Sequence, residues 1–311
     1  MTGREGGRPA VSLRSVSKWF GSVVAVNDVS LEVYPGITGL LGPNGAGKTT
    51  VLHMISGLAR ASEGEVEVLG GPARGRPDLY RRLGVMAEHE AVYGFYTGRR
   101  FVELAARLHG LDPIGPAVDL AIERVALSDV QHRAIGGYSR GMRQRMRLAA
   151  TLVHDPELLL LDEPLNGNDP RQRIEFHDLM RGLAAEGRTI VISSHILEEI
   201  ETLADRHLLM LSGKLAASGD CRAIRERLDE RPYKVRIGAD NPRAMAAALM
   251  RLDAVDSVSL DPDGSIMVLS RDVATLQSSV AGIAREQGIR LMRVEPLDES
   301  LESVFAYVVE Q

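Results

Sequence analysis

The sequence is poor in residues that crosslink a chain or carry it across a membrane. Cys221 is the only cysteine among 311 residues, so an intrachain disulfide framework is excluded and a reducing compartment is favoured. No stretch approaches the ~18 apolar residues that a membrane-spanning helix needs. The opening MTGREGGRPA lacks the apolar centre of a secretory signal. We therefore expect that any membrane part of the working protein is supplied by another chain.

Excess charge and aromatic rings are also scarce. The formal net charge is -5 and aromatic residues make up 4% of the chain, so the composition gives no global attraction to nucleic acid or acidic lipid. Hydrophobic residues at 44% and charged residues at 25% are typical of a globular protein, and the length allows two domains.

Strands alternating with helices dominate the larger part of the chain, which favours an α/β fold with a mainly parallel sheet. VSLRSVSKWF and VNDVSLEVY alternate apolar and polar residues around Gly21, which predicts an antiparallel hairpin. LLLLDEP, with its four consecutive leucines, and TIVISSH predict buried strands of a parallel sheet. HLLMLSGKLAASG predicts a second hairpin. Residues 97–130 are typical of helix, broken by Gly110, Pro113 and Pro116. We expect this domain to span residues 11–230, after a disordered tail over residues 1–10.

A second pattern begins after the charged, proline-containing stretch ERLDERPY. It predicts a strand, a helix, two strands joined through Pro262-Asp263-Gly264, a helix and a strand, followed by a last helix with Ser300 at its cap. The order β-α-β-β-α-β is that of a split βαβ, ferredoxin-like α+β domain, which we place at residues 231–311. This part carries no chemical motif.

The segment GPNGAGKT matches the phosphate-loop pattern G-x-x-x-x-G-K-[ST] in full, after the apolar run ITGLLG and before a helical pattern. Glycines let backbone N–H groups point at phosphates, Lys48 brings a positive charge, and the Thr49 hydroxyl can bind Mg²⁺. The alternative is a tight glycine turn without nucleotide. The predicted ATP-binding residues of this loop are Gly42, Pro43, Asn44, Gly45, Ala46, Gly47, Lys48, Thr49 and Thr50.

Polar residues end two other predicted strands. Asp162 and Glu163 follow four leucines, and His195 follows TIVISS. Because the carboxyl ends of parallel strands share the ligand-binding edge of a sheet, we expect Asp162 to hold Mg²⁺ and Glu163 to polarise an attacking water. His195 would donate to the γ-phosphate. The alternatives are a solvated pair of acids and a satisfied edge histidine.

These motifs, together with YSRGM and NGND, occur in an order that resembles the nucleotide-binding subunit of ABC transporters, over about residues 11–230. The resemblance implies a P-loop ABC cassette: a RecA-like parallel sheet core, an antiparallel β subdomain and a helical subdomain at about residues 90–152. Two such cassettes would sandwich two ATP molecules head to tail. The ferredoxin-like domain resembles that of some exporter-branch members more loosely, and dimer contact or regulation are its expected roles.

The family's signature segment usually reads Leu-Ser-Gly-Gly-Gln, and here it reads Tyr138-Ser139-Arg140-Gly141-Met142. Ser139 can cap the following helix, whose N–H groups then bind an anion. The resemblance makes that anion the γ-phosphate held by the opposite cassette. The departures at Arg140 and Met142 resemble the drug and antibiotic exporters. Arginines recurring through RGMRQRMR offer a nucleic-acid patch as the alternative, but interleaved aromatic residues and a basic surround are missing.

Three further positions follow from the resemblance. Phe20 stands where the family stacks an aromatic ring on adenine, with Trp19 as the competing residue. Asp169 stands in the family's D-loop, expected at the seam between cassettes. Glu88, four residues after Gly84, stands where the family has a glutamine that reaches Mg²⁺ and the attacking water. The chain has no glutamine before Gln131. An ionised carboxylate binds Mg²⁺ but cannot donate a hydrogen bond. The alternative for Glu88 is a solvated loop acid.

We thus expect an Mg²⁺-dependent ATPase that powers export through a separate membrane permease, paired with a second cassette, at the cytoplasmic face of the membrane. Residues 89–96 are the candidates for contacting the permease. Nucleic acid is not an expected partner. The alternative function is a non-transport ABC-type ATPase that acts as a mechanical or regulatory module on a ribosome or a cell-envelope complex.

Overall fold

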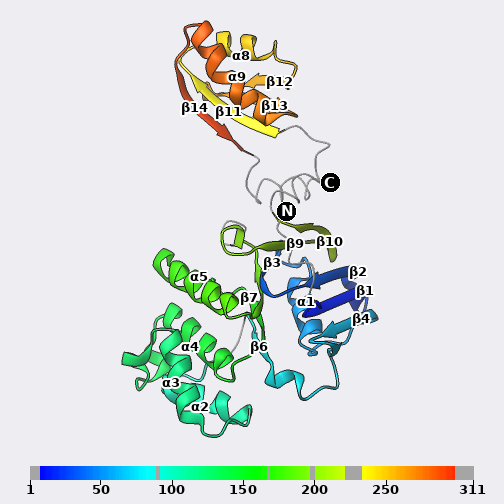
Figure 1. Ribbon diagram of the computed structural model, residues 1–311, viewed down its shortest axis with the longest axis vertical. Helices are drawn as coiled ribbons and strands as arrows, with labels where there is room; N and C mark the ends of the chain where they lie inside the picture. Colours follow the sequence, from blue (N-terminus) through cyan, green and yellow to red (C-terminus); the bar gives the residue numbers. More distant parts are fainter. Residues whose placement is uncertain (1–7, 89–91, 167–168, 197–199, 221–232, 298–311) are drawn as a thin grey trace. The chain divides into compact units, whose positions relative to one another are not determined.

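The computed structural model describes residues 8–88, 92–166, 169–196, 200–220 and 233–297. The chain divides into two compact units, Met1–Asp220 and Cys221–Gln311, each with its own hydrophobic core (Figure 1). The boundary expected near residue 230 lies outside the described residues. Ala10, which we assigned to the tail, belongs instead to the fold, because its N–H donates to the Val33 carbonyl at 2.8 Å and its side chain is buried.

An antiparallel sheet opens the first unit, in the order β2-β1-β4-β5. The predicted hairpin around Gly21 is confirmed: Val11 pairs with Val33 and Phe20 with Val23. Buried apolar residues on one face of this sheet pack against α1 and so form the core between the two sheets of the unit. The elements concerned are β1 (Val11–Phe20), β2 (Val23–Val33), β4 (Glu63–Val68), β5 (Gly71–Pro72) and α1 (Lys48–Ile55).

A second sheet of six strands has the order β10-β9-β3-β8-β7-β6, and every neighbouring pair is parallel except the hairpin β9-β10. Its registers place Met86 beside Leu161 and Asp162 beside Ser193, so the carboxyl ends of β6, β7 and β8 meet at one edge. The strands are β3 (Gly36–Leu41), β6 (Leu83–Met86), β7 (Leu158–Asp162), β8 (Thr189–Ser194), β9 (Arg206–Leu211) and β10 (Lys214–Gly219).

Helices α2 (Gly98–Leu108), α3 (Ile114–Arg124) and α4 (Arg140–Leu152) pack on one another as the helical part of the first unit, while α5 (Pro170–Ala185) contacts β3 and β8. The expectation that Pro116 breaks the helix is wrong. It lies in the first turn of α3, where its missing N–H is not needed. Short 3₁₀ turns occupy Leu79–Arg81, Ser128–Val130 and Ile135–Gly137.

The second unit confirms the predicted β-α-β-β-α-β order, and its antiparallel sheet runs β12-β13-β11-β14, the arrangement of a split βαβ domain. The predicted last helix with Ser300 lies outside the described residues. Within the described part of the chain, no helix is both long and apolar enough to cross a membrane. The elements of this unit are β11 (Tyr233–Ala239), α8 (Pro242–Leu249), β12 (Val255–Leu260), β13 (Ile266–Ser270), α9 (Val273–Glu286) and β14 (Leu291–Pro296).

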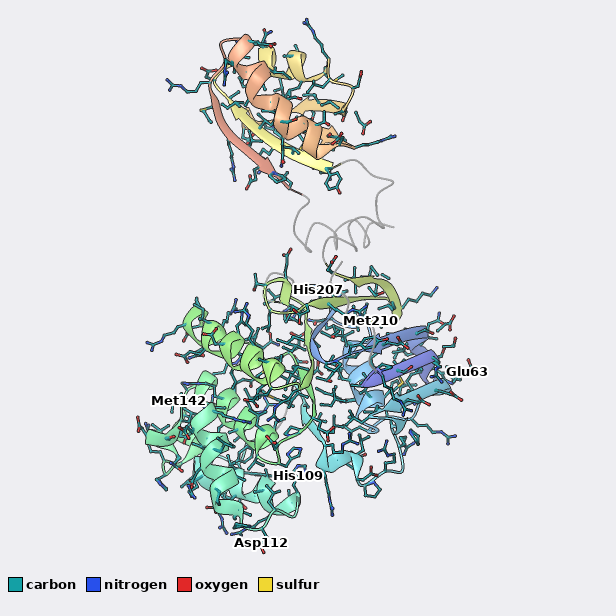
Figure 2. The ribbon with its side chains drawn as sticks, in the orientation of Figure 1. Glu63, His109, Asp112, Met142, His207 and Met210 are labelled. Atoms are coloured by element: carbon teal, nitrogen blue, oxygen red, sulfur yellow. The ribbon has the colours of Figure 1, made fainter. Side chains whose placement is uncertain are left out.

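Two histidine rings stack where α2 ends near the end of α4 (Figure 2 labels His109). The ring centroids of His109 and His154 lie 3.6 Å apart at an interplanar angle of 5°, and His154 Nε2 lies 3.0 Å from the Leu83 carbonyl oxygen. Burial, and then repulsion from the His109 ring, lowers the pKa of His154 from 6.5 to about 4. His154 is therefore neutral in the folded protein at neutral pH.

This depressed pKa predicts an acid-sensitive fold. The unfolded chain binds the His154 proton at higher pH than the folded chain, so stability present above pH 6.5 is lost as the pH falls toward about 4. His154→Gln keeps an N–H donor but cannot titrate. The free energy of unfolding, measured with urea, should therefore fall less on acidification to about pH 5 than in the wild type, by about 1 kcal/mol after allowance for partial exposure. The matched variant of an exposed histidine, His132→Gln, should retain the wild-type pH dependence; equal curves for all three proteins would contradict the assignment.

Candidate functional site

The phosphate loop, Gly42–Thr49, connects β3 to α1 and has the backbone that its sequence predicts. Gly42, Gly45 and Gly47 have φ angles of 150°, 83° and 99°. A Cβ on Gly47 would lie 2.5 Å from the Ala25 carbonyl oxygen, so a larger residue there would clash with β2. The loop is thus held against the hairpin, and α1 begins within its last two residues, at Lys48.

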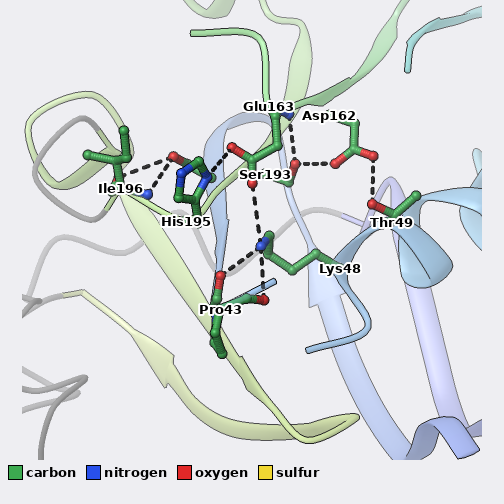
Figure 3. A network of polar contacts seen from close by, with 10 residues as sticks. Pro43, Lys48, Thr49, Asp162, Glu163, Ser193, His195 and Ile196 are labelled. Carbon is green, nitrogen blue, oxygen red and sulfur yellow. Dashed lines mark hydrogen bonds and ion pairs between the residues drawn. The ribbon is translucent and has the colours of Figure 1, made fainter. Parts of the chain in front are cut away.

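Lys48 and Glu163 form a buried ion pair at the centre of the site (Figure 3). Lys48 Nζ lies 3.4 Å from Glu163 Oε1, and the two side chains are 6% and 5% exposed. The same ammonium donates to the Gly42 and Pro43 carbonyls, at 2.7 and 3.3 Å. A buried ammonium that is held by the carbonyls of its own loop is chemically suited to an incoming phosphate, which would offer anionic oxygens in place of neutral ones.

Thr49, Asp162 and Ser193 link the loop to the ends of β7 and β8. The Thr49 hydroxyl donates to Asp162 Oδ2 at 2.7 Å, and the Ser193 hydroxyl donates to Asp162 Oδ1. Ser193 Oγ also accepts the Glu163 N–H at 3.0 Å. A hydroxyl beside a buried carboxylate is the hard oxygen donor set that suits Mg²⁺, which takes its remaining ligands from phosphate and water. These residues therefore fit Mg²⁺ bound together with a nucleotide.

His195 faces Glu163 from the end of β8. Its Nδ1 lies 2.8 Å from Glu163 Oε2. Glu163 has φ 49°, a left-handed conformation that is strained for a non-glycine residue and that turns its carboxylate back toward the loop. Because an ionised carboxylate only accepts, Nδ1 carries the proton in this contact. The expected donation from His195 to a phosphate then requires a second proton on Nε2 or release of the Glu163 contact.

Glu88 follows β6 by two residues and is exposed, and its main-chain carbonyl accepts from Arg147 Nη1 at 3.4 Å. Glu88 and Glu163 line one cavity of about 370 Å³. The structure thus brings Glu88 to the same edge as Asp162 and Glu163, as the sheet register requires. Of the residues expected to contact a partner, 89–91 lie outside the described residues, and Tyr93 is exposed.

The signature segment lies at the start of α4, near the labelled Met142 in Figure 2. Ser139 caps the helix as expected, accepting from the Met142 N–H at 3.2 Å. Asp169 caps α5 in the same way, accepting from the Gln172 N–H at 2.9 Å. A Cβ on Gly141 would meet Gln172 Oε1 at 2.1 Å, so the starts of these two helices are in close contact. Arg140 lines the cavity of Glu88 and Glu163, whereas Ser139, Gly141 and Met142 do not.

Three of the four α4 arginines bind groups of the protein itself. Arg143 donates to the Tyr138 carbonyl, Arg145 donates to the Val125 carbonyl at 3.3 Å, and Arg147 is buried and donates to the Ala87 carbonyl. These contacts give the arginines structural partners and leave little of the set to act as a basic patch.

The two aromatic candidates lie on opposite faces of β1. Phe20 and Trp19 are 54% and 41% exposed. Lys18 Nζ lies 4.6 Å from the Phe20 ring centroid, and Lys18 pairs with Val26, whose side chain approaches Gly47 of the phosphate loop. Phe20 therefore shares the face that points toward the loop, which favours it over Trp19.

Sequence reasoning missed Ser193 and two residues of α4. Gln144 Nε2 donates to the Pro164 carbonyl at 2.9 Å, and Arg147 contacts the backbone at residues 87 and 88. The available signals were weak: a serine at the end of an apolar strand, and an arginine between the apolar residues Met146 and Leu148. Residues 167–168 of the NGND segment lie outside the described residues.

Comparisons with known proteins point to one family. The sequence profile of the ABC transporter family matches residues 26–166. The chain is 33% identical over 306 residues to the daunorubicin resistance ATP-binding protein DrrA3 of Streptomyces coeruleorubidus, covering 96% of this chain and 95% of that protein. It is 33% identical over 302 residues to the bacitracin transport ATP-binding protein BcrA of Bacillus licheniformis, covering 96% and 97%. A solved ATP-binding subunit of an ABC transporter superposes with a TM-score of 0.65 at 25% identity, covering 70% of this chain and 93% of that one.

The contacts of Lys48 predict that Lys48→Ala weakens ATP binding. Removal of the buried ammonium leaves Glu163 without its cation and the phosphates without a charged donor, so affinity should fall at least about tenfold. Fluorescence titration with a labelled ATP analogue measures the effect, and Lys214→Ala on the exposed edge of β10 is the control. Equal affinities for the wild type and the Lys48 variant would refute the assignment.

Proposed function

The chain belongs to the family of ABC transporter ATP-binding proteins, which bind and hydrolyse ATP, and we propose that it powers export through a separate membrane permease. Proteins of this family work with a permease and form pairs. The proposal rests on one observation at the carboxyl edge of the parallel sheet. Lys48 and His195 both contact Glu163 there, and Thr49 donates to the neighbouring Asp162. The relatives named above are resistance and transport proteins, which favours a transporter over the non-transport alternative. We place the subunit at the cytoplasmic face of the membrane, held there by the permease.

We assign the roles in hydrolysis as follows. The phosphate loop, Gly42–Thr49, and the adjacent Thr50 hold the ATP phosphates. Thr49 and Asp162 would hold Mg²⁺, which would neutralise charge on the phosphates. Glu163 accepts the proton of the attacking water. His195 orients Glu163 through Nδ1, and its other nitrogen serves the γ-phosphate once it carries a proton.

The remaining site residues serve the rest of the ATP sandwich. Phe20 stacks on adenine. The start of α4, from Ser139 to Met142, contacts the γ-phosphate held by the second cassette, because its uncapped N–H groups and the helix dipole attract an anion. Asp169 lies at the seam between cassettes. This assignment is supported because Asp169 caps α5, and the start of α5 is in close contact with the signature segment through Gly141 and Gln172. The ferredoxin-like unit contributes dimer contact or regulation.

A groove of about 540 Å³ is our candidate docking site for a cytoplasmic helix of the permease. It lies between α2, α4 and the start of β6, and its lining is mostly apolar. Tyr93, within the segment expected to contact a partner, lines it together with Leu104 and Leu108 of α2. Exposed apolar side chains gathered in one groove are typical of a protein interface.

Glu163→Gln should separate ATP binding from hydrolysis. The amide preserves the size of the side chain but cannot accept the proton of water, so turnover should fall by about 10²–10⁴-fold while ATP still binds. Phosphate release and ATP titration measure the two properties, and Glu65→Gln on exposed β4 is the control. Hydrolysis at the wild-type rate in the Glu163 variant would exclude it as the base.

Leu104→Asp should prevent assembly with the permease. A charge in the apolar groove must be desolvated on docking, which should lower the recovery of the membrane protein in co-purification at least about tenfold. ATP binding by the isolated subunit should persist, since the groove lies outside the phosphate loop. Leu120→Asp is the control, because Leu120 is an exposed leucine of α3 outside the groove. Loss of the partner in both variants, or in neither, would argue against this groove.

A further inference from the structure

Arg147 is a buried cation to which the proposed mechanism gives no role. It lies in α4 with 6% of its surface exposed, and its guanidinium donates to the carbonyls of Ala87 and Glu88 and to Gln144 Oε1. Gln144 in turn donates to the Pro164 carbonyl, one residue after Glu163. One face of α4 therefore holds both the segment after β6 and the segment after β7.

Arg147 also lies between the two cavities described above. It lines the cavity of Glu88 and Glu163, and it lines the candidate docking groove. Arg147 is the one described residue that lines both cavities. A movement of α4 caused by an occupant of the groove would thus be transmitted by Arg147 to the main chain at Glu88.

The charge of Arg147 complements an unusual acid. A guanidinium remains charged when buried, and carbonyl oxygens offset that charge only in part. Glu88 and Glu163 line the same cavity as Arg147, so an acid at position 88 shares that cavity with a cation of α4. An uncharged side chain at position 88 would leave the charge of Arg147 less compensated, and an uncharged side chain at position 147 would do the same to Glu88.

We infer that Arg147 is a positioning residue with two effects: its contacts with the backbone couple the docking groove to the ATP site, and its charge offsets the carboxylate of Glu88. The inference rests on the proposed function. It assigns Arg147 no contact with ATP. The two effects can be separated, because the coupling depends on main-chain carbonyls whereas the charge effect depends on the side chain of residue 88.

A double-mutant cycle on the full chain, alone and in complex with its permease, tests both effects. Arg147→Gln should lower basal kcat about tenfold and raise the Mg²⁺ concentration needed for half-maximal activity, with the KM for ATP changed less than about threefold. Adding Glu88→Gln should return basal kcat to within about twofold of Glu88→Gln alone. Stimulation of ATP hydrolysis by the permease should be lost in Arg147→Gln and remain lost in the double variant.

Other outcomes decide against the inference. A double variant with the same basal defect as Arg147→Gln overturns the charge effect, and full permease stimulation in Arg147→Gln overturns the coupling. Arg145→Gln, on the same helix, is the control. Any loss of basal kcat in this variant should persist when Glu88→Gln is added, and its recovery would show that the rescue is not specific to Arg147. If the wild type hydrolyses no ATP, the proposed function itself fails; normal hydrolysis that is insensitive to Arg147→Gln overturns this inference alone.

Arg147→Lys replaces the glutamine variant if that variant does not fold. Lysine keeps the positive charge, but a single ammonium cannot reproduce the two-pronged contact with both carbonyls. It should retain basal kcat to within about threefold and lose stimulation. A lysine variant with full stimulation, or with a basal defect that Glu88→Gln does not remove, overturns the inference.

Discussion

The buried pair of Lys48 and Glu163 is the interaction on which the site depends. Taking two opposite charges out of water costs several kcal/mol per ion, and only close pairing and additional hydrogen bonds repay that cost. The carbonyls of Gly42 and Pro43 and the His195 ring provide those bonds. The phosphate loop, the end of β7 and the end of β8 must therefore remain together. An anionic ligand at Lys48 changes the balance of charge for all three at once.

A second balance of charge surrounds Glu88. Glu88 and buried Arg147 line the same cavity. In the proposed function, the acid would add negative charge beside bound nucleotide, and the arginine would offset it. This arrangement gives α4 two roles. Its first turn is capped by Ser139 and leaves N–H groups for an anion. Its middle holds the main chain after β6 through Arg147. In the proposed function, α4 would thus connect nucleotide, partner cassette and permease.

Much of the fold could be predicted from local patterns. The hairpin around Gly21, the apolar strand β7 and the helix after Ser139 follow from periodicity and capping, which depend only on neighbouring residues. The errors arose where a residue's effect depends on its exact place in an element, as with Pro116 in the first turn of α3 and Ala10 beside Val33. Among the site residues, Lys48, Asp162 and His195 could be proposed because each lies in a motif or at a strand end. Ser193 and Arg147 could not, because their partners are 31 and 60 residues away in the chain.

The sequence by itself determined the chemical groups and the order of the elements, because glycine spacing, apolar periodicity and capping residues act over a few neighbours. Only the tertiary structure decided which groups meet. The parallel register places Met86 beside Leu161 and Asp162 beside Ser193, and this pairing brings Glu88, Glu163 and His195 to one edge. The packing of α4 then decided that a buried arginine contacts the main chain at Glu88. Such contacts depend on distances across the fold, and no local pattern encodes them.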